Sequence, residues 1–259
     1  MDPVVVGIAG LSGLIFGSFA NVVVHRVPRG ESVVRPGSAC PSCGEAIRAR
    51  DNVPVLSWLI LRGRCRNCSE PISSRYPALE LAMAAVFAVT AATAPRLADL
   101  ILTLPLAFAF VCLVVIDVEH RRLPDAITGP TFLSGILLAF AAGLVAGDVA
   151  LFGWALAVAV ASFAVFWLIA FVAPSGFGLG DVKLAPSLGL AMGFAERAGA
   201  RAFIGFLLAF VLGSVVGLVL IAAGRAGRRT KLPFGPFLVA GTFLVLWTGE
   251  SLVRPWLGP

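Results

Sequence analysis

The segment SGFGLGDVKL, residues 175–184, places three glycines, an aspartate and a lysine between two almost wholly apolar stretches. Charged side chains are costly close to the hydrocarbon of a membrane, so such a segment usually serves a function. A second acid, Asp117, stands directly after another apolar stretch and is followed by VEHRR. How the chain crosses the membrane decides whether these two acids meet.

The composition is that of a polytopic membrane protein. Of 259 residues, 59% are hydrophobic and 13% are charged, whereas soluble domains are about half apolar and about a quarter charged. A crossing helix needs about 20 apolar residues. We therefore predict an all-α fold with about eight transmembrane helices, of which the sixth, short and containing Gly and Pro, is a broken or partly embedded helix. The apolar segments fall at 4–24, 77–95, 100–116, 126–146, 150–173, 184–195, 202–223 and 235–249.

The distribution of basic residues predicts the topology. The first apolar segment follows an acid and no basic residue, and it is too long for a signal-peptide core, so we expect a retained first span with its N-terminus outside. Eight crossings then put 16 of the 20 Lys and Arg residues on one side, in the loops 25–76, 117–125, 174–183 and 224–234. By the positive-inside rule that side is cytoplasmic. The net charge of +6 is thus a topological signal, and no aromatic-interleaved basic face indicates a nucleic-acid partner.

The one large polar segment, residues 25–76, contains two Cys-x2-Cys pairs separated by 21 residues. Each pair offers two thiolates from one tight turn, which suits a closed, structural zinc site with four ligands: Cys40, Cys43, Cys65 and Cys68. Gly44 follows the first pair, where a left-handed backbone is often needed, but Ser69 occupies the equivalent position after the second. Disulfides, redox chemistry and an empty site are the alternatives, and a reducing cytoplasm disfavours disulfides. Zinc would fold a loop too short and polar to build its own core.

Two acids are the candidate catalytic residues. Asp117 follows the third apolar segment, and Asp181 lies in the Gly-rich stretch at the end of the fifth, so both are expected at the cytoplasmic boundary. Two carboxylates that meet in a poorly hydrated place share one proton. In aspartic proteases one of them then activates water while the other donates to the scissile carbonyl. The glycines beside Asp181 would leave room for the backbone of an extended peptide substrate: Gly176, Gly178 and Gly180.

Other polar residues have structural interpretations. Asp125 follows Pro124 and is expected to N-cap the next helix. Lys183 is expected to anchor its segment at the cytoplasmic side. Glu80 falls inside the start of the second span, where an unpaired acid is costly, so it is a candidate functional or supporting residue.

Five motifs, in this order, resemble those of the type IV prepilin peptidases, which are bacterial inner-membrane aspartic proteases of the GxGD class. They are GSFANVVVHRVP, ACPSCG with RCRNC, SRYPALE, DVEHRRLPD and GFGLGDVKL. The likeness covers most of the chain and implies that Asp117 and Asp181 are the catalytic pair. It also implies three parts: a first transmembrane helix (1–24), a cytoplasmic zinc-binding cysteine domain (25–76) and a transmembrane aspartic peptidase domain (77–259).

The resemblance implies two activities. The family cleaves the basic leader from prepilins and pseudopilins at the cytoplasmic membrane face, usually after a glycine. Many members then methylate the new N-terminal residue with S-adenosylmethionine, an activity that goes with the cysteine domain and is therefore expected here. No Gly-rich nucleotide loop follows a strand pattern, so Glu80 and residues 40–76 are the candidate places for this second site.

Two other functions compete with this interpretation. A transporter would also use intramembrane acids, but transport sites usually lie near the midplane between repeats, and no internal repeat is visible. A zinc-dependent membrane scaffold would leave the two aspartates and the glycines unexplained. The lipid bilayer is the remaining partner, and we expect the arginines of residues 25–76 to hold that segment against anionic lipid.

Overall fold

The computed structural model describes residues 1–173, 178–195, 199–225, 227, 230 and 232–248. The regular elements among them are helices, which confirms the predicted all-α class. The chain divides into two compact units, Met1–Ala92 and Thr93–Pro259.

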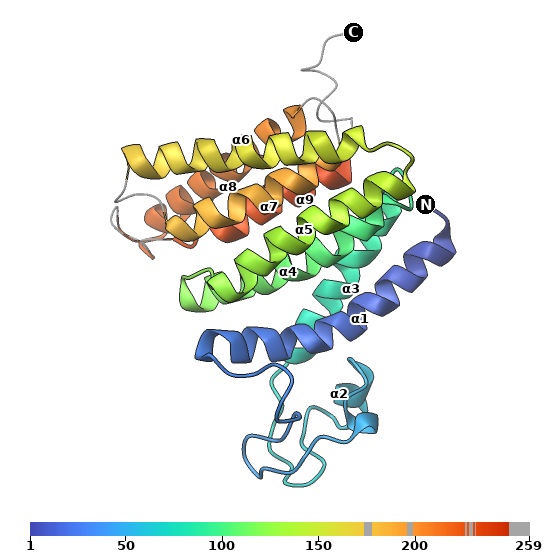
Figure 1. Ribbon diagram of the computed structural model, residues 1–259. Coiled ribbons are helices and arrows are strands. Elements are labelled where there is room, and N and C mark those ends of the chain that lie inside the picture. The colour runs from blue at the N-terminus through green and yellow to red at the C-terminus, as the bar shows by residue number, and fades with distance from the viewer. Residues whose placement is uncertain (174–177, 196–198, 226, 228–229, 231, 249–259) are drawn as a thin grey trace. The chain divides into compact units, whose positions relative to one another are not determined.

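The first unit contains two long helices joined by the polar segment. Helix α1 (Pro3–Arg26) starts with the Asp2 side chain accepting a hydrogen bond from the Val4 N–H, and it continues as the 3-10 helix η1 (Val27–Arg29). Helix α3 (Arg75–Thr93) returns. Between them the chain forms only two short elements, η2 (Ala49–Asp51) and α2 (Leu56–Ile60), and the rest of the polar segment is loop. Figure 1 shows this segment at the end of the unit where α1 stops and α3 begins.

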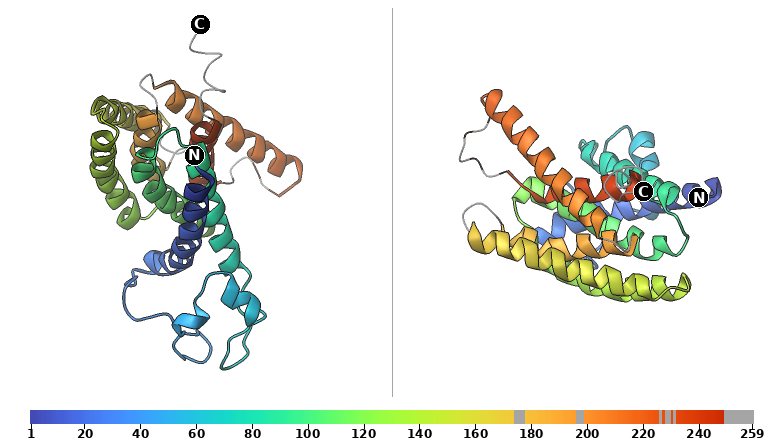
Figure 2. Two further views of the ribbon diagram at one scale, coloured as in Figure 1. Left: turned by 90° about the vertical axis from the view of Figure 1, so that its right-hand side faces the viewer. Right: turned by 90° about the horizontal axis from the view of Figure 1, so that it is seen from above.

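The second unit is a bundle of six described helices (Figure 1): α4 (Asp99–His120), α5 (Asp125–Val145), α6 (Ala150–Val172), α7 (Leu179–Ala195), α8 (Ala200–Ala222) and α9 (Gly235–Thr248). Helix α7 is its centre, because 13 of its 17 residues are buried. Figure 2 shows α8 diverging from the other helices of this unit along its length.

Small residues let α6 and α7 pack closely. A Cβ added at Gly193 would lie 2.7 Å from the Cβ of Val158 on α6, and one added at Gly189 would collide with the side chain of Ser162. Backbones approach in this way at membrane-helix contacts because association there depends on van der Waals packing between helices. Gly189 and Gly193 therefore let the backbone of α7 approach α6 closely.

Six of the described helices are long and apolar enough to cross a membrane: α1, α3, α4, α5, α6 and α8. The prediction of a polytopic membrane protein agrees with this. Helices α7, with 17 residues, and α9, with 14 described residues, are shorter.

Helix α7 begins earlier than the sixth apolar segment, 184–195, predicts. It starts at Leu179, so Asp181 lies in the first turn of this helix and not at the end of the preceding span. The glycines and charges of this stretch resemble a loop in the sequence. An acid in a first turn is favourable, since the exposed N–H groups there carry partial positive charge.

Candidate active site and metal centre

The structure brings the two predicted aspartates together. Asp117 lies in the last turn of α4 and Asp181 in the first turn of α7. Their exposed fractions are only 5% and 8%. The two carboxyl groups are close enough to act on each other electrostatically. Two helices that are distant in sequence thus present a pair of buried acids at one place in the second unit.

A backbone donor orients Asp117. The N–H of Gly235, at the start of α9, donates a hydrogen bond of 3.1 Å to Asp117 Oδ2. A Cβ added at Gly235 would lie only 2.7 Å from the same oxygen, so a larger residue would push the carboxylate away. Sequence reasoning missed Gly235. The run LPFGP marks a helix start, but nothing in it indicates a partner 118 positions away.

The described glycines beside Asp181 have local roles. The backbone N–H of Gly178 hydrogen-bonds to the Asp181 carboxylate. A Cβ added at Gly180 would lie 3.1 Å from the Cβ of Leu123, which also lies beside Gly235. Leu123 thus packs beside both Gly180 and Gly235, and the absence of a side chain at Gly180 leaves room for it. Gly176 lies outside the described residues.

The expectation that Asp125 caps α5 is wrong. The N-cap position of α5 is Pro124, which makes no side-chain cap, and Asp125 is the first helical residue. Its carboxylate instead forms an ion pair of 2.7 Å with Lys183 of α7. The Asp125 carboxylate therefore binds the ammonium group of Lys183 and does not cap the N–H groups in the first turn of α5. This pair joins the starts of α5 and α7 beside a largely apolar cavity of about 570 Å³ between α5, α6 and α7.

The four predicted cysteines form one cluster in the first unit. Their sulfur atoms all lie within 4.8 Å of one another, and the sulfurs of Cys40 and Cys68 are 3.8 Å apart. Tetrahedral zinc with bonds of about 2.3 Å places its sulfur ligands about 3.8 Å apart. All four cysteines are free thiols. This donor set fits a closed tetrahedral metal site.

The two Cys-x2-Cys turns have the same backbone. The Gly44 N–H donates to the Cys40 carbonyl at 2.9 Å, and the Ser69 N–H donates to the Cys65 carbonyl at 3.0 Å. The φ angles are +73° at Gly44 and +60° at Ser69. Ser69 therefore adopts the left-handed conformation that glycine takes more easily, and the departure from the pattern does not alter the turn.

The backbone of each turn favours thiolates. Hydrogen bonds from the N–H groups of Cys68 and Asn67 lower the pKa of Cys65 to about 7. The Glu45 N–H, followed by the Asn67 side chain, lowers the pKa of Cys43. Burial and the bonds to the other three thiols outweigh the Glu70 N–H and raise the pKa of Cys68 to about 12. Metal ligands must be deprotonated, so a bound cation would have to displace the proton of Cys68.

Glu80 is a paired acid in the first unit, not an isolated one. It is buried in α3 and accepts hydrogen bonds from the Val55 N–H, at 2.7 Å, and from the Ser18 side chain. Val55 has φ +59° and ψ −50°, a conformation that a β-branched residue rarely adopts, and the Leu56 N–H bonds to the Pro54 carbonyl across it. This is a γ-turn, which is strained. Glu80 thus fixes a strained turn of the polar segment to α1 and α3.

Two family profiles match the chain over separate ranges. Residues 11–94 match the bacterial peptidase A24 N-terminal domain, and residues 104–221 match the type IV leader peptidase family. The cysteine cluster and Glu80 fall within the first match, and Asp117 and Asp181 fall within the second.

Several curated proteins named prepilin leader peptidase/N-methyltransferase are similar over most of the chain. The one from Aeromonas hydrophila is 34% identical, covering 95% of this chain and 92% of the relative. The one from Pseudomonas aeruginosa is 35% identical, covering 95% and 91%. A relative from Myxococcus xanthus is 42% identical over 85% of this chain, which spans 64% of that longer protein. No solved structure matches. With the resemblance of its motifs confirmed by these relatives, the chain belongs to the type IV leader peptidase family.

Proposed function

We propose that this chain removes the leader peptide from prepilins and pseudopilins and then methylates the new N-terminal residue. The relatives carry both activities in their name. The observation that carries the peptidase assignment is the pair of buried carboxylates, Asp117 and Asp181, held close together by the ends of two packed helices. We assign these two residues as the catalytic pair.

The surroundings of the pair suit the chemistry of aspartic proteases. Two interacting carboxylates share a proton, so one removes a proton from water while the other donates to the carbonyl oxygen of the scissile bond. The Gly235 N–H would hold one oxygen of Asp117 in a fixed orientation, and the Gly178 N–H would do the same for Asp181. Such fixed geometry lowers the entropic cost of reaching the transition state.

The cysteine cluster would hold zinc through Cys40, Cys43, Cys65 and Cys68, in a structural role. All four positions of a tetrahedral ion would be filled by protein, so no site is open for a substrate. S-adenosylmethionine would supply the methyl group for the second reaction: its methyl–sulfur bond would break, the N-terminal amine would gain the methyl group and lose a proton, and S-adenosylhomocysteine would leave. We assign this activity to the first unit, with Glu80 as a supporting residue.

The proposed topology places both sites at the cytoplasmic face of the bacterial inner membrane. Helices α7 and α9 complete eight crossings when they are counted with the six longer ones. The N-terminus then lies outside, and residues 25–76 form a cytoplasmic domain between the first helix and the peptidase domain. A prepilin has a basic leader in the cytoplasm and an apolar helix in the bilayer, so its scissile bond lies at the depth proposed for the acid pair.

The test is incubation of the purified, detergent-solubilised protein with a prepilin, with and without S-adenosylmethionine, followed by mass measurement. We expect loss of the leader in both samples and a gain of one methyl group only with the donor. Asp117→Asn and Asp181→Asn should each lower the cleavage rate by about 10³-fold or more, whereas the matched control Asp148→Asn should cleave normally. Normal cleavage by either active-site variant would refute the catalytic pair.

A further inference from the structure

The first unit contains a cavity that the proposed peptidase site does not use. Its volume is about 510 Å³, and it lies between one face of α1 and two loop segments, residues 33–38 and 52–54. Cavities of about 300–1,000 Å³ are typical of small-molecule sites. The residues of α1 that line it are spaced as on one face of a helix: Ile15, Ser18, Phe19, Val22 and Arg26.

The two ends of the cavity differ in charge. Arg26 stands at one end, where its guanidinium donates to the carbonyls of Ser32 at 2.9 Å and Pro36 at 2.8 Å. Toward the other end Ser18 lines the cavity and its side chain bonds to the buried carboxylate of Glu80. Ser18 and Arg26 are eight positions apart on α1, or about 12 Å along the axis. Apolar side chains, including Phe19 and Val22, lie between them.

We infer that this cavity binds S-adenosylmethionine, an inference that rests on the methyltransferase function proposed above. The donor combines an apolar, flat adenine with a carboxylate and with a sulfonium and an ammonium cation. Arg26 at one end suits the carboxylate, the Ser32 and Pro36 carbonyls beside it suit the ammonium group on the same carbon, and the apolar walls toward Ser18 suit the adenine.

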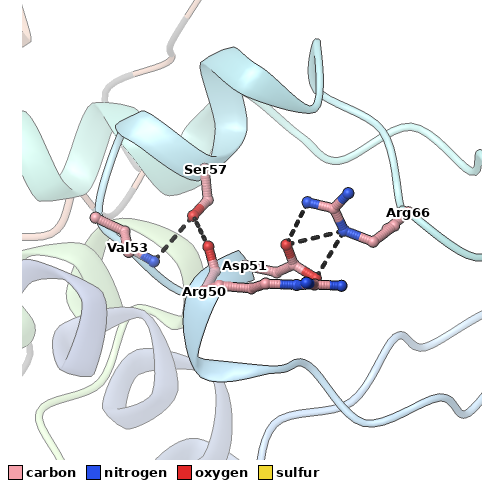
Figure 3. A network of polar contacts seen from close by, with 5 residues as sticks. All are labelled: Arg50, Asp51, Val53, Ser57 and Arg66. Carbon is pink, nitrogen blue, oxygen red and sulfur yellow. Dashed lines mark hydrogen bonds and ion pairs between the residues drawn. The ribbon is translucent and has the colours of Figure 1, made fainter.

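The loop walls of the cavity are held by the cysteine cluster and its neighbours. Gly37 and Ser38 lead directly into the first Cys-x2-Cys turn. On the other wall, Ser57 Oγ accepts from the Val53 N–H at 2.9 Å and donates to the Arg50 carbonyl at 3.1 Å (Figure 3).

An ion pair ties that second wall to the second turn. Asp51 pairs with Arg66, at 2.6 Å, and Arg66 stands next to Cys65 (Figure 3). A metal that fixes both turns therefore also fixes both loop walls, which gives a physical reason for a cysteine domain in a methyltransferase.

The experiment measures the dissociation constant of radiolabelled S-adenosylmethionine for the purified full chain in detergent. Val22→Trp fills the cavity from the α1 side and should weaken binding at least about tenfold. Val34→Trp fills it from the loop side and provides a second, independent variant. Leu11→Trp is the matched control, because Leu11 is 65% exposed on α1 and does not line the cavity.

Zinc content and leader removal should be retained in all three variants, which shows that each has folded. Donor binding of wild-type strength by both Val22→Trp and Val34→Trp would overturn the cavity assignment, while a wild-type protein that methylates would keep the proposed function. A wild-type protein that neither binds the donor nor methylates a cleaved prepilin would overturn both.

Discussion

The two units build their sites in opposite ways. In the second unit, Asp117 and Asp181 sit at the ends of helices whose packing sets their positions. In the first unit, the cysteines lie on loops with only two short helical elements between α1 and α3. A packed bundle positions side chains through its core, whereas a polar loop segment needs cross-links to hold a shape. Removing the metal ligands and disturbing the helix packing should therefore impair different parts of the molecule.

The largest effect is expected on removing the metal ligands. Replacing Cys40 and Cys43 with serine leaves two ligands, which cannot hold zinc in a tetrahedral site, so residues 33–71 should lose protection from hydrogen exchange and methylation should stop. Leader removal should continue, because the acid pair does not depend on this cluster. Cys112→Ala is the control, since Cys112 is buried in α4 outside the cluster. Persistent methylation by the double variant would show that the loop holds its shape without metal.

The next effect concerns the backbone donor to Asp117. The methyl group of Gly235→Ala would lie 2.7 Å from Asp117 Oδ2, which displaces the carboxylate and lengthens the hydrogen bond. Misplacement of a catalytic group by about 1 Å costs about 100-fold in rate, so the turnover number for leader removal should fall by that order. Gly153→Ala adds the same methyl group where no atom lies within 4 Å and should leave the rate unchanged. Equal turnover in the two variants would contradict a positioning role for Gly235.

A smaller effect is expected from forcing α6 and α7 apart. Gly193→Val introduces side-chain atoms where Val158 already approaches to 2.7 Å, and overpacking of this kind costs about 1–3 kcal/mol. The thermal midpoint of the second unit should therefore fall in detergent. The same substitution at Gly7, where nothing lies within 4 Å, should leave the midpoint unchanged. An unshifted midpoint in Gly193→Val would mean that the helices do not need the close contact.

The smallest effect is expected from the exposed pair of Asp125 and Lys183. Exposed ion pairs contribute about 0.2–1 kcal/mol, so Lys183→Met should slow leader removal by a few-fold at most. Exchanging the two charges, with Asp125→Lys and Lys183→Asp, should restore part of the loss. A loss in Lys183→Met that the exchange deepens would show that the lysine acts by itself and not through Asp125.

The sequence predicted the parts of these sites that depend on spacing. Two Cys-x2-Cys pairs can form one cluster whatever path the loop between them takes. The four cysteines of this chain do form one cluster. The acid pair followed from membrane topology, because equal depth on one face is readable from apolar lengths and basic loops. Cysteine spacing, the lengths of apolar segments and the positions of basic loops can all be read along the sequence.

The residues that sequence reasoning missed depend on three-dimensional packing. Gly235 reaches Asp117 only because α9 packs against α4, and its own motif gives no sign of this. Glu80 was recognised as unusual, but its partners, the Ser18 side chain and the Val55 N–H, were not. Val55 has a β-branched side chain and a positive φ angle. Conformational propensities do not predict this combination.

The central position of α7 has a consequence for biogenesis. Its 17 residues span about 26 Å, less than the hydrocarbon thickness of about 30 Å. They also include an aspartate and a lysine, so this segment would partition poorly into lipid when it leaves the translocon alone. Its buried surface is apolar and glycine-rich and faces α6, the segment synthesised just before it. We expect the two helices to be inserted as a hairpin, so that Asp181, an acid of the proposed peptidase site, reaches its depth only after α6 is in the membrane.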